Sequence, residues 1–155
     1  MKFKTRLVVN PEWDQDPHII YTLGRLDARI FPDDEPLERA DFTKGWWWVV
    51  YVNEPEYIGW YPVAYCGLGK HYGDRCKLSR AGVLASYRGH GLQRRMIWTR
   101  ERKARELGMV RVLTYTLWNN TPSSNNLIHC GYRLWTPGNA TKKEDSTLLY
   151  WYKDL

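Results

Sequence analysis

The segment 83–93 constrains the fold of this chain more than any other. A pattern typical of a strand ends there, Gly89 and Gly91 follow in a short turn, and a long basic helix is predicted to begin at Gly91. The first backbone N–H groups of a helix have no partner inside the helix, and the helix dipole adds partial positive charge at that end. Such a turn can bind a pyrophosphate, because residues without a Cβ let phosphate oxygens approach the backbone. Three arginines add positive charge nearby: Arg88, Arg94 and Arg95.

Two other phosphate-binding motifs do not fit this turn. A Walker A loop requires Gly-Lys-Ser/Thr after its glycines, and no such triplet follows. A dinucleotide-binding fingerprint requires a different glycine spacing inside an early βαβ unit. Two interpretations therefore remain open from the residues alone. The turn is either an anion site or an ordinary strand–turn–helix connection with a solvated basic helix face.

Positive charge is concentrated around the same turn. Residues 70–111 carry twelve Lys and Arg against three Asp and Glu, whereas residues 1–69 carry seven against eleven, in a chain of net charge +6. A concentrated positive field attracts a polyanion. A phosphorylated cofactor and a nucleic acid both meet that description.

The hydrophobic patterns predict a mixed α/β fold in a single domain, residues 1–155. Asp16 followed by Pro17 is typical of a helix start, and residues 67–74 are predicted to form a loop. Strands are expected at 2–9, 46–52, 57–66, 76–84, 110–117, 132–135 and 147–153, and helices at 17–30, 36–42, 91–107 and 123–129. This order predicts several antiparallel neighbours in the sheet.

The composition argues against a membrane or secreted protein. No apolar run approaches the roughly 20 residues that a membrane span needs, and residues 1–6 are not followed by the apolar region of a signal peptide. We therefore expect a cytoplasmic protein without a membrane partner, as a monomer or homodimer. The cysteines, Cys66, Cys76 and Cys130, match no zinc spacing, so free thiols are expected, with a bridge between Cys66 and Cys76 across a hairpin as the alternative.

Two motifs, in the right order, resemble the GNAT N-acetyltransferases. Arg88-x-x-Gly91-x-Gln93 resembles the cofactor motif Arg/Gln-x-x-Gly-x-Gly/Ala, with Gln93 in place of the final small residue. Residues 120–132 resemble the family's Asn-x-x-Ala/Ser…Gly-Phe/Tyr segment, including its spacing. The resemblance covers about residues 43–153.

The resemblance implies a mostly antiparallel central sheet, flanked by helices, whose middle strands 76–85 and 110–117 splay apart. It implies direct transfer of the acetyl group of acetyl-CoA to a primary amine, with the pantetheine arm between those strands and no metal. A backbone N–H between Val83 and Ala85 is expected to donate to the thioester carbonyl, a bond that strengthens as negative charge develops. The implied cofactor-binding residues are Val83, Leu84, Ala85, Arg88, Gly89, His90, Gly91, Leu92, Gln93, Asn120 and Asn125.

The acid and the base of such a reaction are harder to assign. An amine with a pKa near ~10.4 must lose a proton before it attacks, and Glu54 is our candidate base among several loop carboxylates and His71. In this family a Tyr on the helix after the Asn motif often protonates the departing thiolate, but its position here is Leu127. Tyr132 is our candidate acid, with Tyr115, water and unassisted departure as alternatives.

The acceptor is expected to be an amine of a small molecule or of a protein. The family's acceptor groove is formed largely by the first two helices and the strands after them, and this region is acidic here. Its carboxylates are Asp27, Asp33, Asp34, Glu35, Glu38, Asp41, Glu54 and Glu56. They would attract a cationic amine and repel nucleic-acid phosphate. The tryptophans 46–48 alternate between two faces of a strand, where they either pack the core or hold the acceptor by cation–π contact.

Two other functions remain open. The basic stretch 94–111 and the plentiful aromatic residues would also suit a nucleic-acid-binding module, or an acetyltransferase that acts on an amine-bearing base. Gln93 and Leu127 would equally suit a GNAT protein that binds CoA without catalysis.

Overall fold

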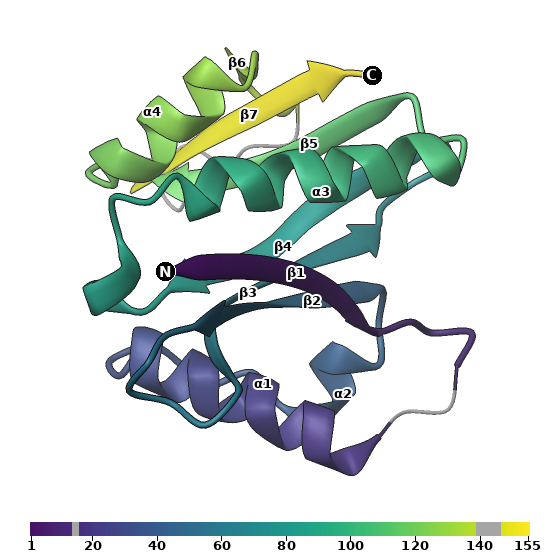
Figure 1. Cartoon of the computed structure of the whole chain (residues 1–155). Helices are drawn as coiled ribbons and strands as arrows, with labels where there is room; N and C mark the ends of the chain where they lie inside the picture. The colour runs from purple at the N-terminus through teal and green to yellow at the C-terminus, as the bar shows by residue number, and fades with distance from the viewer. Residues whose placement is uncertain (14–15, 139–146) are drawn as a thin grey trace.

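The computed structural model describes residues 1–13, 16–138 and 147–155. In these residues the chain forms one seven-stranded sheet, four α-helices and the 3₁₀ helix η1 (Figure 1). The strands are β1 (Lys2–Val9), β2 (Trp46–Asn53), β3 (Trp60–Lys70), β4 (Arg75–Val83), β5 (Arg111–Leu117), β6 (Arg133–Trp135) and β7 (Leu148–Asp154). The helices are α1 (Pro17–Ile30), α2 (Arg39–Phe42), η1 (Ala85–Tyr87), α3 (Leu92–Glu106) and α4 (Thr121–His129).

The strand order in the sheet is β1-β2-β3-β4-β5-β7-β6. Neighbouring strands are antiparallel except β4 and β5, which are parallel and joined through α3. Pairing between β4 and β5 ends at Lys77 opposite Leu113, and beyond this point the two strands have no paired residues. The mixed α/β fold with a mostly antiparallel sheet and splayed middle strands is therefore confirmed.

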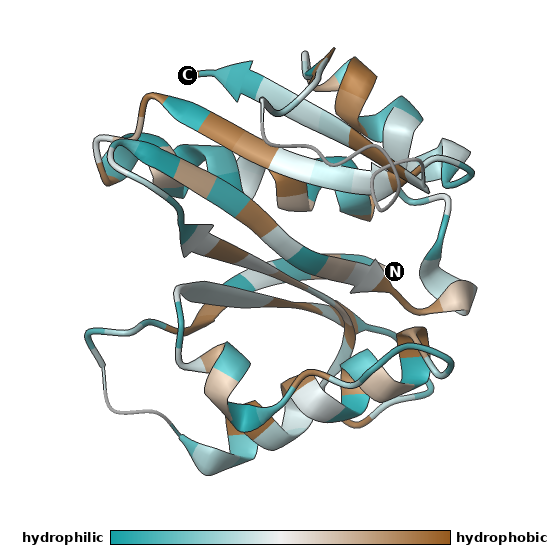
Figure 2. Cartoon of the chain, turned by 180° about the vertical axis from the view of Figure 1, so that it is seen from behind, coloured by the Kyte–Doolittle hydropathy of each residue, from teal (hydrophilic) through white to brown (hydrophobic). Residues whose placement is uncertain are grey.

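Helices cover both faces of the sheet (Figure 1). The side chain of Asp16 accepts the N–H of His18 at 2.9 Å and Pro17 follows, so α1 begins where the capping signal predicted. Helix α1 packs on β3 and β4, and α3 packs on the same strands and on α4. Hydrophobic and polar residues are interspersed along the helices, as expected where one side is buried (Figure 2). No helix in the described part of the chain has the length and apolar character of a membrane span.

The three consecutive tryptophans belong to the core. Residues 46–48 are all buried, because β2 lies between β1 and β3 with helices over both faces. The Trp47 ring packs edge-on against Phe42 of α2, with ring centroids 4.9 Å apart, and stacks near Tyr65 at 6.2 Å. Of the two roles open for this segment, core packing is the one that the structure shows.

The predicted loop at 67–74 was wrong for residues 67–70, because β3 continues to Lys70, and residues 71–74 alone connect β3 to β4. Leu68 is fully buried and pairs with β2 and β4, which holds this stretch in the sheet. The glycine that suggested a turn serves close packing instead, since a Cβ at Gly67 would lie 2.7 Å from the ring of Trp47.

A β-bulge changes the direction of the second half of β4. From the pair Cys66–Ala81 to the pair Leu68–Leu78, β3 advances by two residues and β4 by three. The extra residue in β4 interrupts the ladder and bends the strand. Beyond the bulge, β4 runs along the gap that separates it from β5.

A buried arginine of α3 holds this bulge. The Arg100 side chain is 3% exposed and donates to the carbonyl of Gly67 at 3.3 Å and to that of Ser79 at 3.1 Å. No carboxylate lies within ion-pair distance of Arg100 in the described residues. The carbonyls of the two strands therefore replace the water that this cation would otherwise bind.

The cysteines are free thiols, as expected, and the alternative bridge between Cys66 and Cys76 is not formed. All three are buried. Burial raises the pKa of the Cys66 thiol to about 11, and burial likewise raises that of Cys76 to about 11.

Candidate active site

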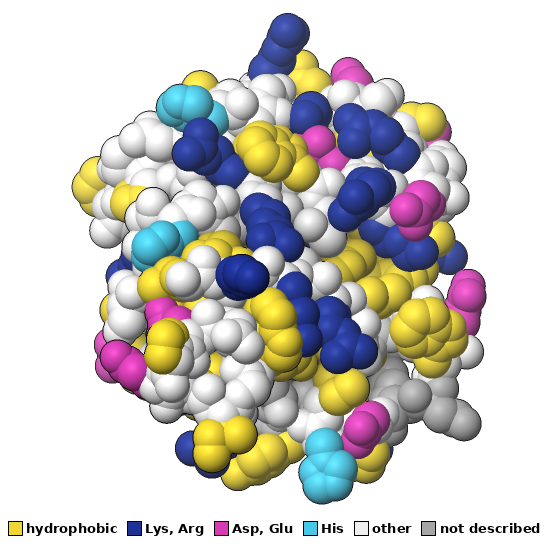
Figure 3. All heavy atoms as spheres, in the orientation of Figure 1, with side chains coloured by type: hydrophobic (Ala, Val, Ile, Leu, Met, Phe, Trp, Pro, Cys, Tyr) yellow, Lys and Arg dark blue, Asp and Glu magenta, His cyan; other side chains and the backbone are white. Residues whose placement is uncertain are grey.

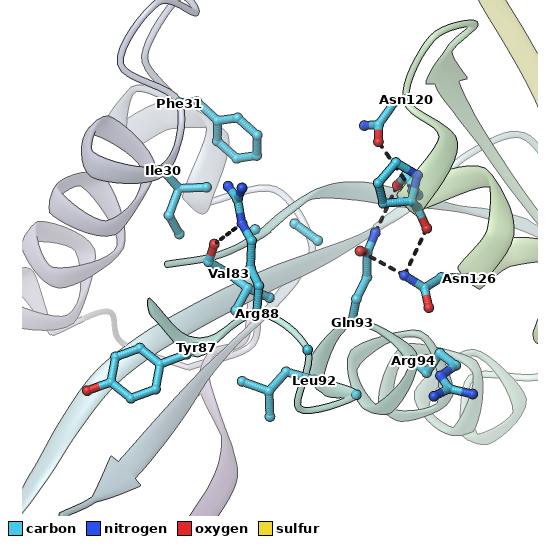
Figure 4. Close-up of a pocket in the computed structure, with 16 residues that line it drawn as sticks. Ile30, Phe31, Val83, Tyr87, Arg88, Leu92, Gln93, Arg94, Asn120 and Asn126 are labelled. Carbon is cyan, nitrogen blue, oxygen red and sulfur yellow. Dashed lines mark hydrogen bonds between the residues drawn. The ribbon is translucent and has the colours of Figure 1, made fainter. Parts of the chain in front are cut away.

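A cleft of about 420 Å³ opens where β4 and β5 diverge (Figure 4). Residues 81–83 of β4 line it between two walls. One wall contains Ile30 and Phe31 at the end of α1, together with Tyr87 and Arg88. The other consists of the first turns of α3 and α4. The cleft thus collects residues from the segment 83–93 and from the later Asn-containing segment.

The turn before α3 presents unpaired backbone donors to this cleft. The N–H groups of Leu92, Gln93 and Arg94 have no acceptor among the described residues, and the next amide, that of Arg95, bonds to the Gly91 carbonyl at 3.1 Å. Gly91 caps α3 with a φ of +70°, a left-handed conformation that favours glycine. A Cβ at Gly91 would meet no other atom within 4 Å, so the space beside these donors is open.

The lining of the cleft is positively charged. Arg88 and Arg94 contribute to it, and none of its described lining residues is acidic. The Arg88 Nε–H donates to the Val83 carbonyl at 3.4 Å, which holds its guanidinium at the mouth of the gap (Figure 4). Lys and Arg side chains also gather over the face of the molecule that contains α3 (Figure 3). Together with the unpaired amides, these charges make the turn suitable for an anion.

The amide of Val83, at the end of β4, points into the gap. The Leu84 N–H donates to the Val63 carbonyl of β3 at 2.9 Å, so it is not available to a ligand. Because neighbouring residues in an antiparallel strand point their N–H groups to opposite sides, the amide of Val83 faces away from β3. Of the three amides expected to meet a thioester carbonyl, Val83 is therefore the one that the geometry favours, and Leu84 is excluded.

The predicted cofactor residues are only partly brought together. Those that line the cleft are Val83, Arg88, Gly89, Gly91, Leu92, Gln93 and Asn120. Those that do not line it are Leu84, Ala85, His90 and Asn125. Asn125 was predicted to line the cleft, but Asn126 lines it instead. The exact start of α4 decides which of these two adjacent residues faces the cleft. Pro122 and Ser123 were also missed, and the helical spacing of 3.6 residues from Asn126 was the signal that could have found them.

The side chain of Gln93 turns away from the anion site and toward α4. Its Nε2 donates to the Ser123 hydroxyl at 2.8 Å, and the Asn126 Nδ2 donates to its Oε1 at 3.1 Å (Figure 4). The departure from a small residue at this position therefore leaves the backbone N–H of Gln93 unobstructed.

Asn120 caps α4. Its Oδ1 accepts the N–H of Ser123 at 3.2 Å, which leaves the Nδ2 group without a partner among the described residues. Asn120 thus offers a ligand in the cleft a donor rather than an acceptor.

Glu54 reaches the cleft only through Tyr87. The buried Tyr87 hydroxyl donates to Glu54 Oε2 at 2.9 Å and lies 3.5 Å from the Tyr57 hydroxyl. Its ring lines the cleft, but its hydroxyl points away from the gap between Arg88 and Gln93 (Figure 4). The hydrogen bond with Tyr57, burial and the Glu54 carboxylate all raise the pKa of Tyr87, so this hydroxyl keeps its proton.

The structure does not bring Tyr132 to the cleft. Tyr132 is 4% exposed and is absent from the cleft lining, and Lys153 Nζ lies 5.8 Å from the centre of its ring. Burial and the nearby Glu101 carboxylate raise its pKa. Leu127 is also buried, so the position where the family often has a Tyr lies in the core here.

A buried carboxylate fixes the α1 wall. Asp27 accepts hydrogen bonds from Arg80 Nη1 at 3.0 Å, from the Tyr65 hydroxyl, and from the backbone N–H of Leu37 at 2.9 Å. The same Arg80 Nη1 donates to the carbonyl of Glu35 at 3.0 Å. This network joins α1, the segment after it, β3 and β4. Asp27 is therefore a structural ion-pair partner and not a surface carboxylate of an acceptor groove.

Comparisons with known proteins agree with this geometry. Residues 11–132 match the sequence model of the acetyltransferase (GNAT) family, and no curated protein sequence matches the chain significantly. The fold is similar to an IAA acetyltransferase from Bacillus cereus ATCC 14579 (12% identity, TM-score 0.69, 99% of this chain and 100% of the other). It is also similar to an acetyltransferase from Bacillus subtilis in complex with CoA (14% identity, TM-score 0.70, 99% of this chain and 99% of the other). A third similar structure is the ribosomal-protein-S18-alanine N-acetyltransferase from Escherichia coli (10% identity, TM-score 0.70, 99% of this chain and 94% of the other). The two sequence motifs, the splayed sheet and the family match together show that the chain belongs to the acetyltransferase (GNAT) family.

Proposed function

We propose that this protein transfers the acetyl group of acetyl-CoA to a primary amine of a small molecule or of a protein. The observation that carries the proposal is the set of unpaired amides at the start of α3, which face an open, positively charged cleft at the end of β4, where this strand diverges from β5. The similar Bacillus subtilis structure contains CoA, and the similar Escherichia coli enzyme is an alanine N-acetyltransferase, which supports both halves of the reaction.

The residues present fit a CoA diphosphate. The amides of Leu92, Gln93 and Arg94 would donate to its oxygens, Arg88 would add charge, and Gly91 leaves room for close approach. When bound, acetyl-CoA supplies the acyl group in activated form, as a thioester. We propose that the arm lies in the gap between β4 and β5, within reach of the Asn120 Nδ2 group.

The protein's own contribution to the reaction is mainly positioning. We propose that the Val83 N–H donates to the acyl carbonyl oxygen, where negative charge develops as the amine nitrogen forms its bond to the carbonyl carbon. The carbon–sulfur bond breaks as this oxygen re-forms its double bond to carbon, and the sulfur leaves as thiolate. The amine proton leaves to water, because no carboxylate lines the described cleft and Glu54 acts only by holding the Tyr87 hydroxyl. The thiolate is a good leaving group and departs without a tyrosine donor.

The alternative of nucleic-acid binding receives less support from the structure. Part of the charge in the stretch 94–111 is buried or paired. Arg100 is buried, and two arginines form ion pairs at the surface: Arg105 lies 3.7 Å from Glu101, and Arg111 lies 2.6 Å from Asp154. These cations are therefore less available to a phosphate backbone.

The binding claim is tested by filling the open space beside the amides. We expect Gly91→Trp to abolish binding of acetyl-CoA in titration calorimetry, because the side chain would project into the cleft. Gly108→Trp is a matched control: Gly108 follows α3 at its other end, has a φ of +71°, and a Cβ added to it would likewise meet no other atom within 4 Å. This variant carries the same backbone strain and should bind normally.

An unchanged affinity in Gly91→Trp would remove the basis of the proposal. Transfer itself is tested by a panel of amines and peptides with detection of the released thiol. Binding of acetyl-CoA without thiol release from any amine would favour the non-catalytic alternative. Salt-dependent binding of nucleic acid that persists without acetyl-CoA would favour the nucleic-acid alternative.

A further inference from the structure

Gln93 joins the two helices whose first turns form one wall of the cleft. Its backbone belongs to the first turn of α3, while its side chain makes two hydrogen bonds to α4, with Ser123 at 2.8 Å and with Asn126 at 3.1 Å. The Asn126 Nδ2 also donates to the Pro122 carbonyl at 3.0 Å. One side chain of α3 is thus connected to the backbone of the first turn of α4 (Figure 4).

Little else holds that first turn in place. Leu127, near the end of α4, is the buried residue of this helix, and the preceding residues 121–126 are polar or proline and are at least partly exposed. On the sheet side, the Ser124 hydroxyl lies 3.2 Å from that of Thr116, which accepts from Trp151 Nε1 at 3.0 Å. Hydrogen bonds therefore replace apolar packing as the means of placing the first turn of α4.

We propose that Gln93 is a positioning residue that fixes the start of α4 relative to the start of α3, and so controls the affinity for acetyl-CoA. This inference rests on the proposed function. The unpaired amides belong to α3, whereas Asn120 caps α4. A ligand that contacts both binds well only if the two turns keep their separation. A glycine or alanine at position 93 has no side-chain group that could make this connection.

The test is a double-mutant cycle with Gln93→Ala, Ser123→Ala and the double variant. Loss of one or two hydrogen bonds, each worth about 1 kcal/mol, predicts that Gln93→Ala weakens acetyl-CoA binding roughly five- to thirtyfold and Ser123→Ala roughly fivefold. If Gln93 acts through α4, the double variant should bind about as well as Gln93→Ala alone. The KM for acetyl-CoA should rise in the same proportion, with kcat within about twofold of wild type.

Three results would overturn the inference. Additive losses would mean that the Gln93 side chain contacts the ligand itself. A lowered Tm with an unchanged Kd for acetyl-CoA would mean that the connection serves stability alone. If the wild-type protein does not bind acetyl-CoA, both the proposed function and this inference are wrong. The first two results would leave the proposed function unchanged.

Discussion

Replacing Arg100 by methionine would show whether the buried arginine keeps β4 in its bulged course. Methionine has a similar length and tolerates irregular surroundings, so the change removes the charge and the donors with little change in volume. It deletes the hydrogen bonds to the carbonyls of Gly67 and Ser79, at 3.3 and 3.1 Å. Both carbonyls lie in the bulged part of the sheet, where the regular ladder is interrupted.

The magnitude follows from two opposing effects. Each buried acceptor left without a donor costs about 1–3 kcal/mol, so two carbonyls cost about 2–6 kcal/mol. Removing a cation that is 3% exposed and has no carboxylate partner in the described residues relieves part of its desolvation cost, which is several kcal/mol. We expect the first effect to win, because three carbonyls already solvate the guanidinium, and predict a loss of about 2 kcal/mol in the free energy of unfolding.

The assay is urea unfolding followed by tryptophan fluorescence, together with calorimetry of acetyl-CoA binding. We expect Arg100→Met to lose affinity as well, roughly tenfold, because a straighter β4 would turn the Val83 amide out of the gap. Arg102→Met is the matched control, since Arg102 lies exposed on the same helix and should change the free energy of unfolding by less than about 0.5 kcal/mol. If Arg100→Met is as stable as wild type or more so, and binds acetyl-CoA normally, then the arginine does not hold the bulge and our reasoning fails.

Two further substitutions and a pH series test the packing of the cleft wall, helix α1 and the buried thiols. Gly82→Ala should lower the free energy of unfolding by about 1–3 kcal/mol and weaken acetyl-CoA binding, because the new Cβ would lie 2.5 Å from the Cγ2 of Ile30 in the cleft wall. Gly24→Ala, within α1 and with no atom within 4 Å, should instead stabilise by about 0.5–1 kcal/mol in the same urea assay. The pKa values of Cys66 and Cys76 are raised from 9.0 to about 11 in the folded protein, so the stability that their neutral thiols contribute is complete below pH 9 and is lost as the pH rises to 11. Unfolding at pH 8 and pH 10.5 measures this loss, and a Cys66→Ala variant that loses as much stability as wild type would contradict the assignment to that thiol.

The parts of the fold that the sequence predicted depend on short-range physics. Asp16 and Pro17 predicted the start of α1 because a cap involves only the residues of one turn. The turn at Gly91 was predicted for the same reason, since its unpaired amides and left-handed glycine are local properties. The splayed strands were expected from the family resemblance rather than from the residues themselves.

The parts that the sequence did not predict depend on contacts between distant segments. Gly67 looks like a turn residue, and only the ring of Trp47 across the sheet explains its place in a strand. Arg100 looks like one more cation on a basic helix, and only the bulge in β4 explains its burial. Asn126 replaced Asn125 in the cleft because a shift of one residue at the start of a helix changes which side chain faces inward.

Contacts between distant segments also change the prediction for the acceptor. The acidic first half of the chain suggested a groove for a cationic amine, but several of its carboxylates serve the fold. Asp27 pairs with Arg80, Asp41 accepts the N–H of Glu38 at the start of α2, and Glu54 holds Tyr87. These groups are already bound, so they contribute little attraction at the depth of the cleft.

Three exposed carboxylates lie in the segment after α1. Asp33, Asp34 and Glu35 begin two residues after Phe31, which lines the cleft, and their side chains make no hydrogen bond or ion pair with another described residue. The cleft lining itself carries Arg88 and Arg94, which suit the phosphates of CoA and repel a second cation. An amine acceptor would therefore be attracted by the segment after α1 while it is still charged, and would have to lose its proton before it enters the gap beside Val83. We propose that this distribution of charge lets the amine lose its proton to water before it enters the gap, without a base inside the cleft.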